Sequence, residues 1–105
     1  MAFFPFMIQM QDKLCVIGGG GKVAYRKVSM MLSFGARVTV IAPKICDELQ
    51  KIESKQGALL LVQRPFEDGD IEGADVVIMA TNDSEVNSHI AAICKDKRIL
   101  VNVVD

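Results

Sequence analysis

The 105-residue sequence predicts an α/β fold in which a parallel sheet carries helices on both faces. Two observations lead to this prediction. Apolar runs of strand length alternate with segments of helical periodicity along the chain, as they do in parallel sheets. The first apolar run, 14–17, stops at the four glycines 18–21, and a helical pattern follows at once. Strand, glycine turn and helix in this order form the context of a dinucleotide-binding fingerprint.

The four glycines allow two registers of the fingerprint G-x-G-x-x-[GA]. The third small position lets the helix pack closely against its strand. A register that starts at Gly18 puts the β-branched Val23 there, whereas one that starts at Gly19 puts Ala24 there, so we choose the second. An ordinary turn without a ligand is the alternative interpretation of such a glycine cluster.

The first half of the chain contains three predicted strands, at 13–18, 37–41 and 58–62. A helix after the glycines has a stripe of Ala24, Val28, Met31 and Leu32, and we expect Gly35 to end it. A second helix has its apolar residues at 45, 49 and 52, and we expect Gly57 to be its stop. Residues 3–10 are expected to be an extended lead-in, because Pro5 prevents an early helix.

The second half of the chain contains two further predicted strands, at 75–80 and 99–104. Between the third and fourth strands, the polar stretch 64–73 is broken by proline and glycine, so we expect one helical turn at most. The helix after the fourth strand is expected to begin at 81–83, with Asn82 and Glu85 in a capping box.

Strands that alternate with helices are joined by right-handed crossovers. With a glycine turn after the first strand, this predicts a Rossmann-type sheet of about five strands in the order 3-2-1-4-5, forming one domain over residues 1–105. A ligand crevice is expected where the strand order reverses, at the carboxyl ends of the strands. Four segments meet there: the glycine turn, 42–44, 81–83 and 104–105.

Composition excludes several classes of function. The formal net charge is −1, so nothing favours a nucleic-acid partner or an anionic membrane surface. No apolar run approaches membrane-spanning length, and we expect a cytoplasmic protein. The three cysteines have no metal-ligand spacing, and we interpret them as small apolar residues in a reducing compartment, with no metal site.

The second predicted strand ends without the carboxylate that usually binds the adenosine ribose. It ends instead in Ala42-Pro43-Lys44, which leaves Lys44 available to a phosphate, so the residues alone leave NAD and NADP open. Lys22 and Arg26 share a face at the start of the first helix, where they offer positive charge to a pyrophosphate or an acidic substrate. A solvated helix face is the alternative for Arg26, and His89 is interpreted as a surface residue.

Asp105 follows an apolar strand that delivers it to the crevice. A carboxylate partly shielded from water there can have a raised pKa and act as a general base. The alternative is that it only ends a strand. Asp83 is the competing carboxylate, but its simpler role is to cap the helix that it opens.

The chain also resembles a known family. The resemblance is carried by the segments 4–8, 17–27, 35–43, 80–87 and 102–105, including Val-Ala-x-Arg-Lys after the glycines, Ala-Pro after the second strand and Asn-Val-Val-Asp at 102–105. Together they are similar to the N-terminal precorrin-2 dehydrogenase module of siroheme synthase. The similarity extends over the whole chain.

The resemblance implies NAD-dependent oxidation of precorrin-2, a tetrapyrrole, to sirohydrochlorin, with NAD favoured over NADP. It makes Asp105 the catalytic residue, and iron insertion at the same site is known for some members of the family. Members of the family continue beyond this aspartate into a dimerisation region and a helical part, so we expect a homodimer in the full-length protein. The rival hypothesis is a non-catalytic NAD-binding or nucleotide-sensing module.

The candidate residues follow from these arguments. Those expected to bind the cofactor are Gly19, Gly20, Gly21, Lys22, Val23, Pro43, Lys44, Thr81 and Asn82. Arg26 and Asn102 are candidates for substrate binding, and Asp105 is the candidate catalytic residue.

Overall fold

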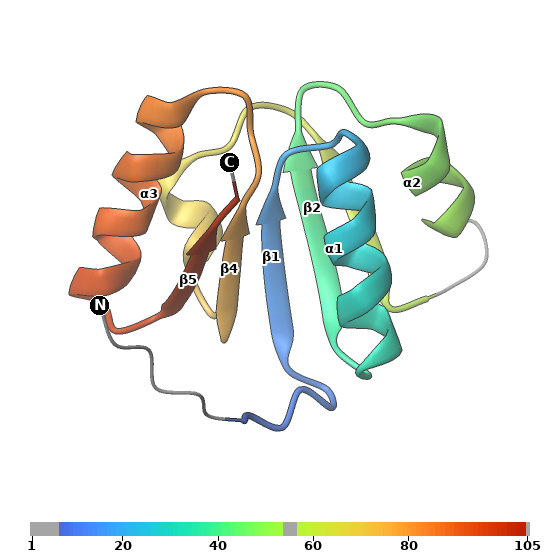
Figure 1. Ribbon diagram of the computed structural model, residues 1–105, viewed down its shortest axis with the longest axis horizontal. Helices are drawn as coiled ribbons and strands as arrows, with labels where there is room; N and C mark the ends of the chain where they lie inside the picture. Colours follow the sequence, from blue (N-terminus) through green and yellow to red (C-terminus); the bar gives the residue numbers. More distant parts are fainter. Residues whose placement is uncertain (1–6, 54–56, 105) are drawn as a thin grey trace.

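The computed structural model describes residues 7–53 and 57–104, which form a three-layer α/β arrangement (Figure 1). One parallel sheet of five strands lies in the middle, in the order β3-β2-β1-β4-β5. This confirms the predicted strand order and the Rossmann-type fold. The strands are β1 (Leu14–Gly18), β2 (Arg37–Ala42), β3 (Leu59–Gln63), β4 (Val76–Met79) and β5 (Leu100–Val103).

Helices cover both faces of the sheet, as predicted. Helices α1 (Lys22–Ser33) and α2 (Asp47–Glu53) pack on one face, and α3 (Ser84–Asp96) packs on the other, together with the short 3-10 helix η1 (Asp68–Ile71) (Figure 1). Helix η1 is the single turn expected between the third and fourth strands. It replaces a full crossover helix because glycine and proline interrupt this stretch.

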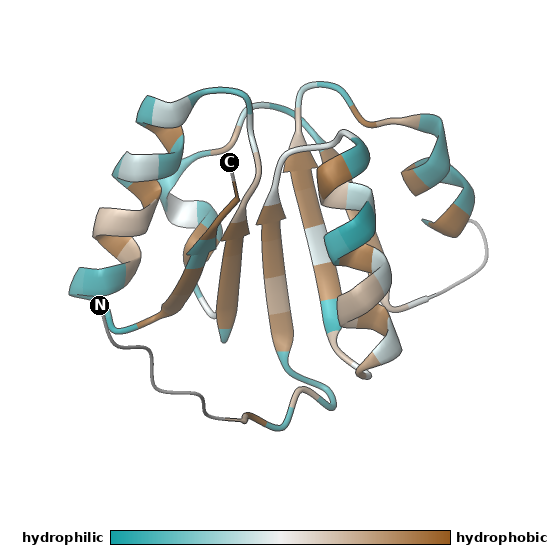
Figure 2. Cartoon of the chain, in the orientation of Figure 1, coloured by the Kyte–Doolittle hydropathy of each residue, from teal (hydrophilic) through white to brown (hydrophobic). Residues whose placement is uncertain are grey.

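The core consists of two apolar layers separated by the sheet, and the central strands are apolar along most of their length (Figure 2). Strand β1 contributes side chains to both layers: Cys15 and Ile17 face α1, and Val16 faces α3. Successive side chains of a strand point to opposite faces, so a strand covered on both faces is apolar throughout. Ala24 and Val28 of α1 are fully buried against this sheet.

The structure bears on two predictions about helix ends, the start of α3 and the end of α2. The predicted capping box of Asn82 and Glu85 is wrong: Asp83 is the N-cap of α3, and its carboxylate accepts hydrogen bonds from the backbone N–H groups of Glu85 (3.0 Å) and Val86 (3.2 Å). An aspartate at this position reaches two N–H groups that have no partner within the helix. Helix α2 is described as far as Glu53 and Gly57 lies in the turn before β3, while the residues between them, 54–56, lie outside the described residues, so Gly57 as the stop of this helix stays a prediction.

The lead-in before β1 is described from residue 7 onward. Residues 7–10 form neither helix nor strand, and Met10 is buried in the layer under α1. Pro5 and the aromatic residues near it lie outside the described residues. Within the described ranges, no helix is long and apolar enough to cross a membrane.

Candidate functional site

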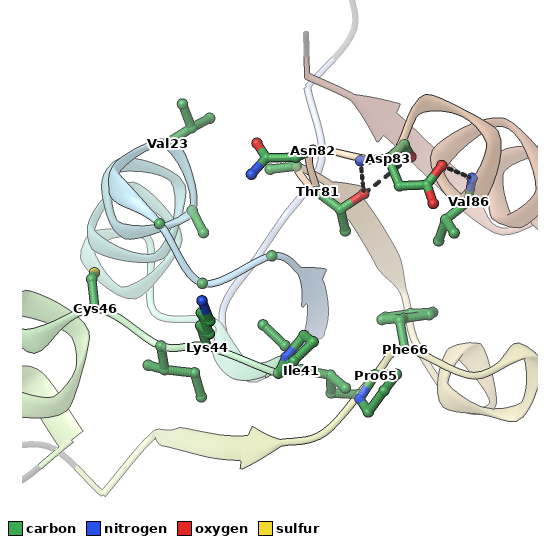
Figure 3. A pocket seen from close by; sticks show the side chains of 18 of the residues that line it. Val23, Ile41, Lys44, Cys46, Pro65, Phe66, Thr81, Asn82, Asp83 and Val86 are labelled. Carbon is green, nitrogen blue, oxygen red and sulfur yellow. Dashed lines mark hydrogen bonds between the residues drawn. The ribbon is translucent and has the colours of Figure 1, made fainter.

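A cavity of about 780 Å³ lies at the carboxyl ends of β1, β2 and β4, where the strand order reverses (Figure 3). Its volume is in the range typical of sites for small molecules and cofactors. Four loops build it: the glycine turn after β1, the loop after β2, the segment after β3 and the loop after β4. The lining residues are 19–24, 41–46, 65–66, 80–83 and Val86.

The glycine turn is shaped by close backbone contacts that only glycine permits. Gly19 has a φ of +120°, and a Cβ there would lie 2.5 Å from the carbonyl oxygen of Ala80. A Cβ on Gly20 would collide with the carbonyl oxygen of Lys44. These two glycines therefore let the turn fit between the loops that follow β4 and β2.

Gly21 differs from the two glycines before it, because a Cβ at this position would meet open space. It is the N-cap residue of α1, and no side chain caps this helix end. The first turn of α1 contains no acidic residue, so its N–H groups and the positive end of its dipole remain available. Open space beside an uncapped helix N-terminus is a suitable cradle for a pyrophosphate.

The fingerprint register agrees with the packing of α1. Ala24 is fully buried against the sheet, whereas Val23 is half-buried and lines the pocket. Helix α1 thus meets the sheet through the small residue, as the register from Gly19 to Ala24 requires.

The loop after β2 closes against the glycine turn. The backbone N–H of Cys46 donates a hydrogen bond to the carbonyl oxygen of Gly20 (2.8 Å). The side-chain amide of Gln63 in β3 donates a hydrogen bond to the carbonyl oxygen of Pro43 (3.1 Å). Pro43 and Lys44 are exposed and line the pocket, and no carboxylate stands between Ala42 and Cys46.

The loop after β4 forms the opposite wall. Thr81, Asn82 and Asp83 line it, and the backbone N–H of Ala80 donates a 2.7 Å hydrogen bond to the carbonyl oxygen of Gly18. Asn87 of α3, 5% exposed, is buried behind this wall and is hydrogen-bonded to Thr81. Figure 3 shows the Thr81 side chain hydrogen-bonded to the backbone of Asp83, and the Asp83 carboxylate hydrogen-bonded to the backbone N–H of Val86.

Phe66 and Pro65 line the pocket and had no place in the sequence-based site. Phe66 is half-buried and lies next to Gly18. Arg64 and Asp70 hold this segment through two hydrogen bonds of 2.8 and 2.6 Å. The available signal was positional, since residues 65–66 follow the carboxyl end of β3 at the same sheet edge as the other loops.

The hydrogen bonds from Arg64 lower the pKa of the Asp70 carboxyl below its ordinary value, and the same contact raises the pKa of Arg64. The backbone N–H of Glu67 also donates to this carboxylate (2.7 Å), which strengthens the effect. The pair therefore anchors the segment that carries Phe66 into the pocket.

All nine residues expected to bind the cofactor line this one pocket: Gly19, Gly20, Gly21, Lys22, Val23, Pro43, Lys44, Thr81 and Asn82. The two substrate candidates do not line it. Arg26 is exposed and lies one helical turn beyond Lys22 on the same face of α1, further from the glycine turn. Asn102 is exposed on β5. Asp105 lies outside the described residues.

His89, Cys15 and Cys94 lie outside the pocket. His89 is exposed, as expected, and its Nε2 lies 3.0 Å from an oxygen of Asp68. Burial raises the pKa of the Cys15 thiol to about 12 and also raises that of Cys94. The described residues contain no group of three or more histidine, cysteine or acidic side chains that could hold a metal ion.

The curated proteins that match this chain include siroheme synthases. Those of Thioalkalivibrio sulfidiphilus (strain HL-EbGR7) and Nitrosospira multiformis (strain ATCC 25196) are 42% and 44% identical over 105 and 108 residues, which is 100% of this chain. The match covers 21% and 23% of their lengths. The chain thus spans about a fifth of the siroheme synthases that it matches.

Two solved structures are similar to this chain. The structure of SirC, a precorrin-2 dehydrogenase, matches with a TM-score of 0.83 and 30% identity, over 95% of this chain and 48% of that one. The apo-structure of D-lactate dehydrogenase from Escherichia coli matches with a TM-score of 0.68 at 15% identity, over 91% of this chain and 30% of that one, and indicates the fold alone.

A family model described as putative NAD(P)-binding matches residues 6–105, nearly the whole chain. Its range includes the glycine turn and every loop of the pocket. The chain therefore belongs to this family of putative NAD(P)-binding domains.

Proposed function

We propose that this chain is the NAD-dependent dehydrogenase domain that oxidises precorrin-2 to sirohydrochlorin in siroheme biosynthesis. The single observation that carries the proposal is the pocket, in which a dinucleotide-type glycine turn meets the loops of three other strands. The likeness to siroheme synthases and to SirC supports the substrate class.

The pocket residues fit a dinucleotide. Open space at Gly21 and the uncapped start of α1 suit the pyrophosphate, with Lys22 nearby to offset its charge. The adenosine half would lie toward Pro43 and Lys44, where the fingerprint normally binds ribose, and the other half toward Thr81 and Asn82. The apolar Phe66 helps to exclude water from the cavity.

The oxidation removes a hydride and a proton from the substrate. When bound, the nicotinamide ring supplies the hydride acceptor. We propose that Asp105 takes the proton as general base. The backbone N–H of Val104, the preceding residue, donates a 2.9 Å hydrogen bond to the carbonyl oxygen of Met79, which holds the chain beside the end of β4. Asp83 is a weaker candidate because its carboxylate caps α3.

The partners follow from the same chemistry. A tetrapyrrole with many carboxylates would be attracted by Lys22 and Lys44 at the pocket, while Arg26 and Asn102 would contact the parts of it that extend outward. We propose a homodimer in the full-length protein and a cytoplasmic location, and we favour NAD over NADP. Iron insertion by the full-length protein is a further part of this proposal.

The test has two parts. NAD and NADP are titrated separately into the purified chain by calorimetry, and tighter binding of NAD is expected. Precorrin-2 is then added with NAD, and formation of NADH is followed by its absorbance. Equal or tighter NADP binding would reject the cofactor preference. NAD binding without any turnover, in this chain and in one joined to the remaining half of SirC, would favour a nucleotide-sensing module instead.

A further inference from the structure

The hydroxyl of Thr81 lies in a hydrogen-bond network at the pocket wall. Its oxygen is close to the side-chain oxygen of Asn87, and it lies 3.2 Å from both the backbone nitrogen and the carbonyl oxygen of Asp83. A hydroxyl has one hydrogen to donate and two lone pairs that accept. The hydrogen bonds within the protein therefore determine whether the Thr81 hydroxyl can donate to a ligand or accept from it.

Asn87 settles the direction of the hydroxyl hydrogen. Its side-chain nitrogen donates a 3.1 Å hydrogen bond to the carbonyl oxygen of Thr81, which can only accept. The side-chain oxygen of Asn87 must then face the Thr81 hydroxyl, and it accepts the hydroxyl hydrogen. This contact is shorter than the one to the carbonyl oxygen of Asp83. Because Asn87 is buried, water does not compete for its oxygen.

Within the described residues, one lone pair of the Thr81 hydroxyl oxygen receives no hydrogen bond. The backbone N–H of Asp83 donates to one lone pair of the Thr81 oxygen. The hydrogen is used by Asn87, so the single remaining site on the oxygen is an acceptor. Such an oxygen accepts a hydrogen bond from a ligand N–H or O–H group and repels the oxygens of a phosphate.

We infer that Asn87 is a positioning residue, which holds the Thr81 hydroxyl as an acceptor for the nicotinamide riboside half of the dinucleotide. The inference rests on the proposed function and extends it to a specific contact. Thr81 lies beyond β4, on the opposite side of the glycine turn from the loop after β2. The adenosine half belongs to that loop, so the ligand group at Thr81 is a ribose hydroxyl or the carboxamide N–H of the other half.

The experiment compares three ligands that share the adenine half. ADP, ADP-ribose and NAD are titrated by calorimetry into the wild-type chain and into Thr81→Val, Thr81→Ser and Asn87→Leu. Loss of one hydrogen bond predicts about a tenfold weaker affinity of Thr81→Val for NAD. Affinity for ADP should be unchanged, and Thr81→Ser, which keeps the hydroxyl, should bind NAD like the wild type.

Asn87→Leu tests whether Asn87 acts through the hydroxyl. It should weaken NAD but not ADP, and it should add no further loss in the Thr81→Val background, because the group that it positions is already gone. ADP binding also reports whether each variant is folded. If weakening begins with ADP-ribose, the donor is a ribose hydroxyl; if it appears with NAD alone, the donor is the carboxamide.

Two results would overturn the inference while leaving the proposed function intact: NAD affinity unchanged in Thr81→Val, or equal losses for ADP and NAD. Additive losses in the double variant would reject the role of Asn87. A wild-type chain that binds neither NAD nor NADP would instead overturn the proposed function, and this inference with it.

Discussion

The backbone N–H of Cys46 donates a 2.8 Å hydrogen bond to the carbonyl oxygen of Gly20, so the loop after β2 is fastened directly to the glycine turn. Two loops that are separated in sequence by a whole helix and strand thus form one rigid wall of the pocket. The contact is close because Gly20 has no side chain to separate its backbone from Lys44. A Cβ on Gly21, by contrast, would meet open space, so substitutions at Gly20 and Gly21 should affect stability and NAD binding differently.

Gly20→Ala is expected to destabilise the chain and abolish NAD binding, because its methyl group would collide with the Lys44 carbonyl oxygen. Gly21→Val is expected to abolish binding without unfolding, because its side chain enters the open space of the pocket. Thermal unfolding and NAD calorimetry on both variants separate the two effects. A strongly destabilised Gly21→Val, or full NAD affinity in Gly20→Ala, would contradict this interpretation.

Asp105→Ala is expected to keep NAD affinity and to lose about 10²–10⁴ in turnover of precorrin-2, the usual cost of losing a general base. The assay follows NADH formation in the chain joined to the remaining half of SirC, which supplies the part of that structure that this chain does not match. Asp83→Asn is the comparison: it should lower the stability of α3 and leave more activity. Near wild-type turnover in Asp105→Ala would reject its assignment as the base.

The Arg64–Asp70 pair predicts an acid-sensitive anchor for Phe66. Because the pair lowers the pKa of Asp70, its stabilising effect is present above the ordinary carboxyl value of 3.8 and is lost as the pH falls through the lower folded value. Asp70→Asn should lower the melting temperature by several degrees at neutral pH. The difference from wild type should shrink below pH 3.8. The exposed Asp96→Asn is the control, and an equal effect there would argue against a specific anchor.

Thiol reactivity should distinguish Cys46 from the other two cysteines. Cys15 and Cys94 are buried and their raised pKa values keep them protonated, whereas Cys46 is half-buried and lines the pocket. Since the thiolate is the reactive form, a thiol reagent such as DTNB should modify Cys46 first. NAD should slow the reaction. A fast-reacting thiol that remains in Cys46→Ser would contradict the expectation.

The edge strand β5 should promote association of the chain. Leu100 and Val103 are 44% and 41% exposed on β5, which is an edge strand of the described sheet, and such edges pair with other chains. Light scattering at high concentration should detect species larger than a monomer, and Val103→Lys should reduce them. Leu60→Lys on β3 is the comparison at the other edge of the sheet, where Leu60 is 57% exposed, and a loss of association there instead would assign the contact to β3. A monomeric wild type would reject the prediction.

The sequence by itself determined the order of the sheet and the edge where the pocket forms. Parallel strands joined by right-handed crossovers bring their carboxyl ends to one edge, so residues after three different strands could be assigned to one site before any contact was known. This is why the nine cofactor candidates lie together. The choice of Ala24 over Val23 also followed from side-chain size and helical period alone.

Only the tertiary structure decided which side chains complete the site. Phe66 reaches Gly18 because Arg64 and Asp70 fix the path of a short irregular segment, and periodicity says nothing about such a path. Arg26 shares a face of α1 with Lys22 but lies one helical turn further along the helix, and only Lys22 lines the pocket. Asn87 contacts the site through its hydrogen bonds to Thr81, which lies six residues before it at the other end of a loop. Burial keeps water from competing for these hydrogen bonds, and burial is a property of the folded chain.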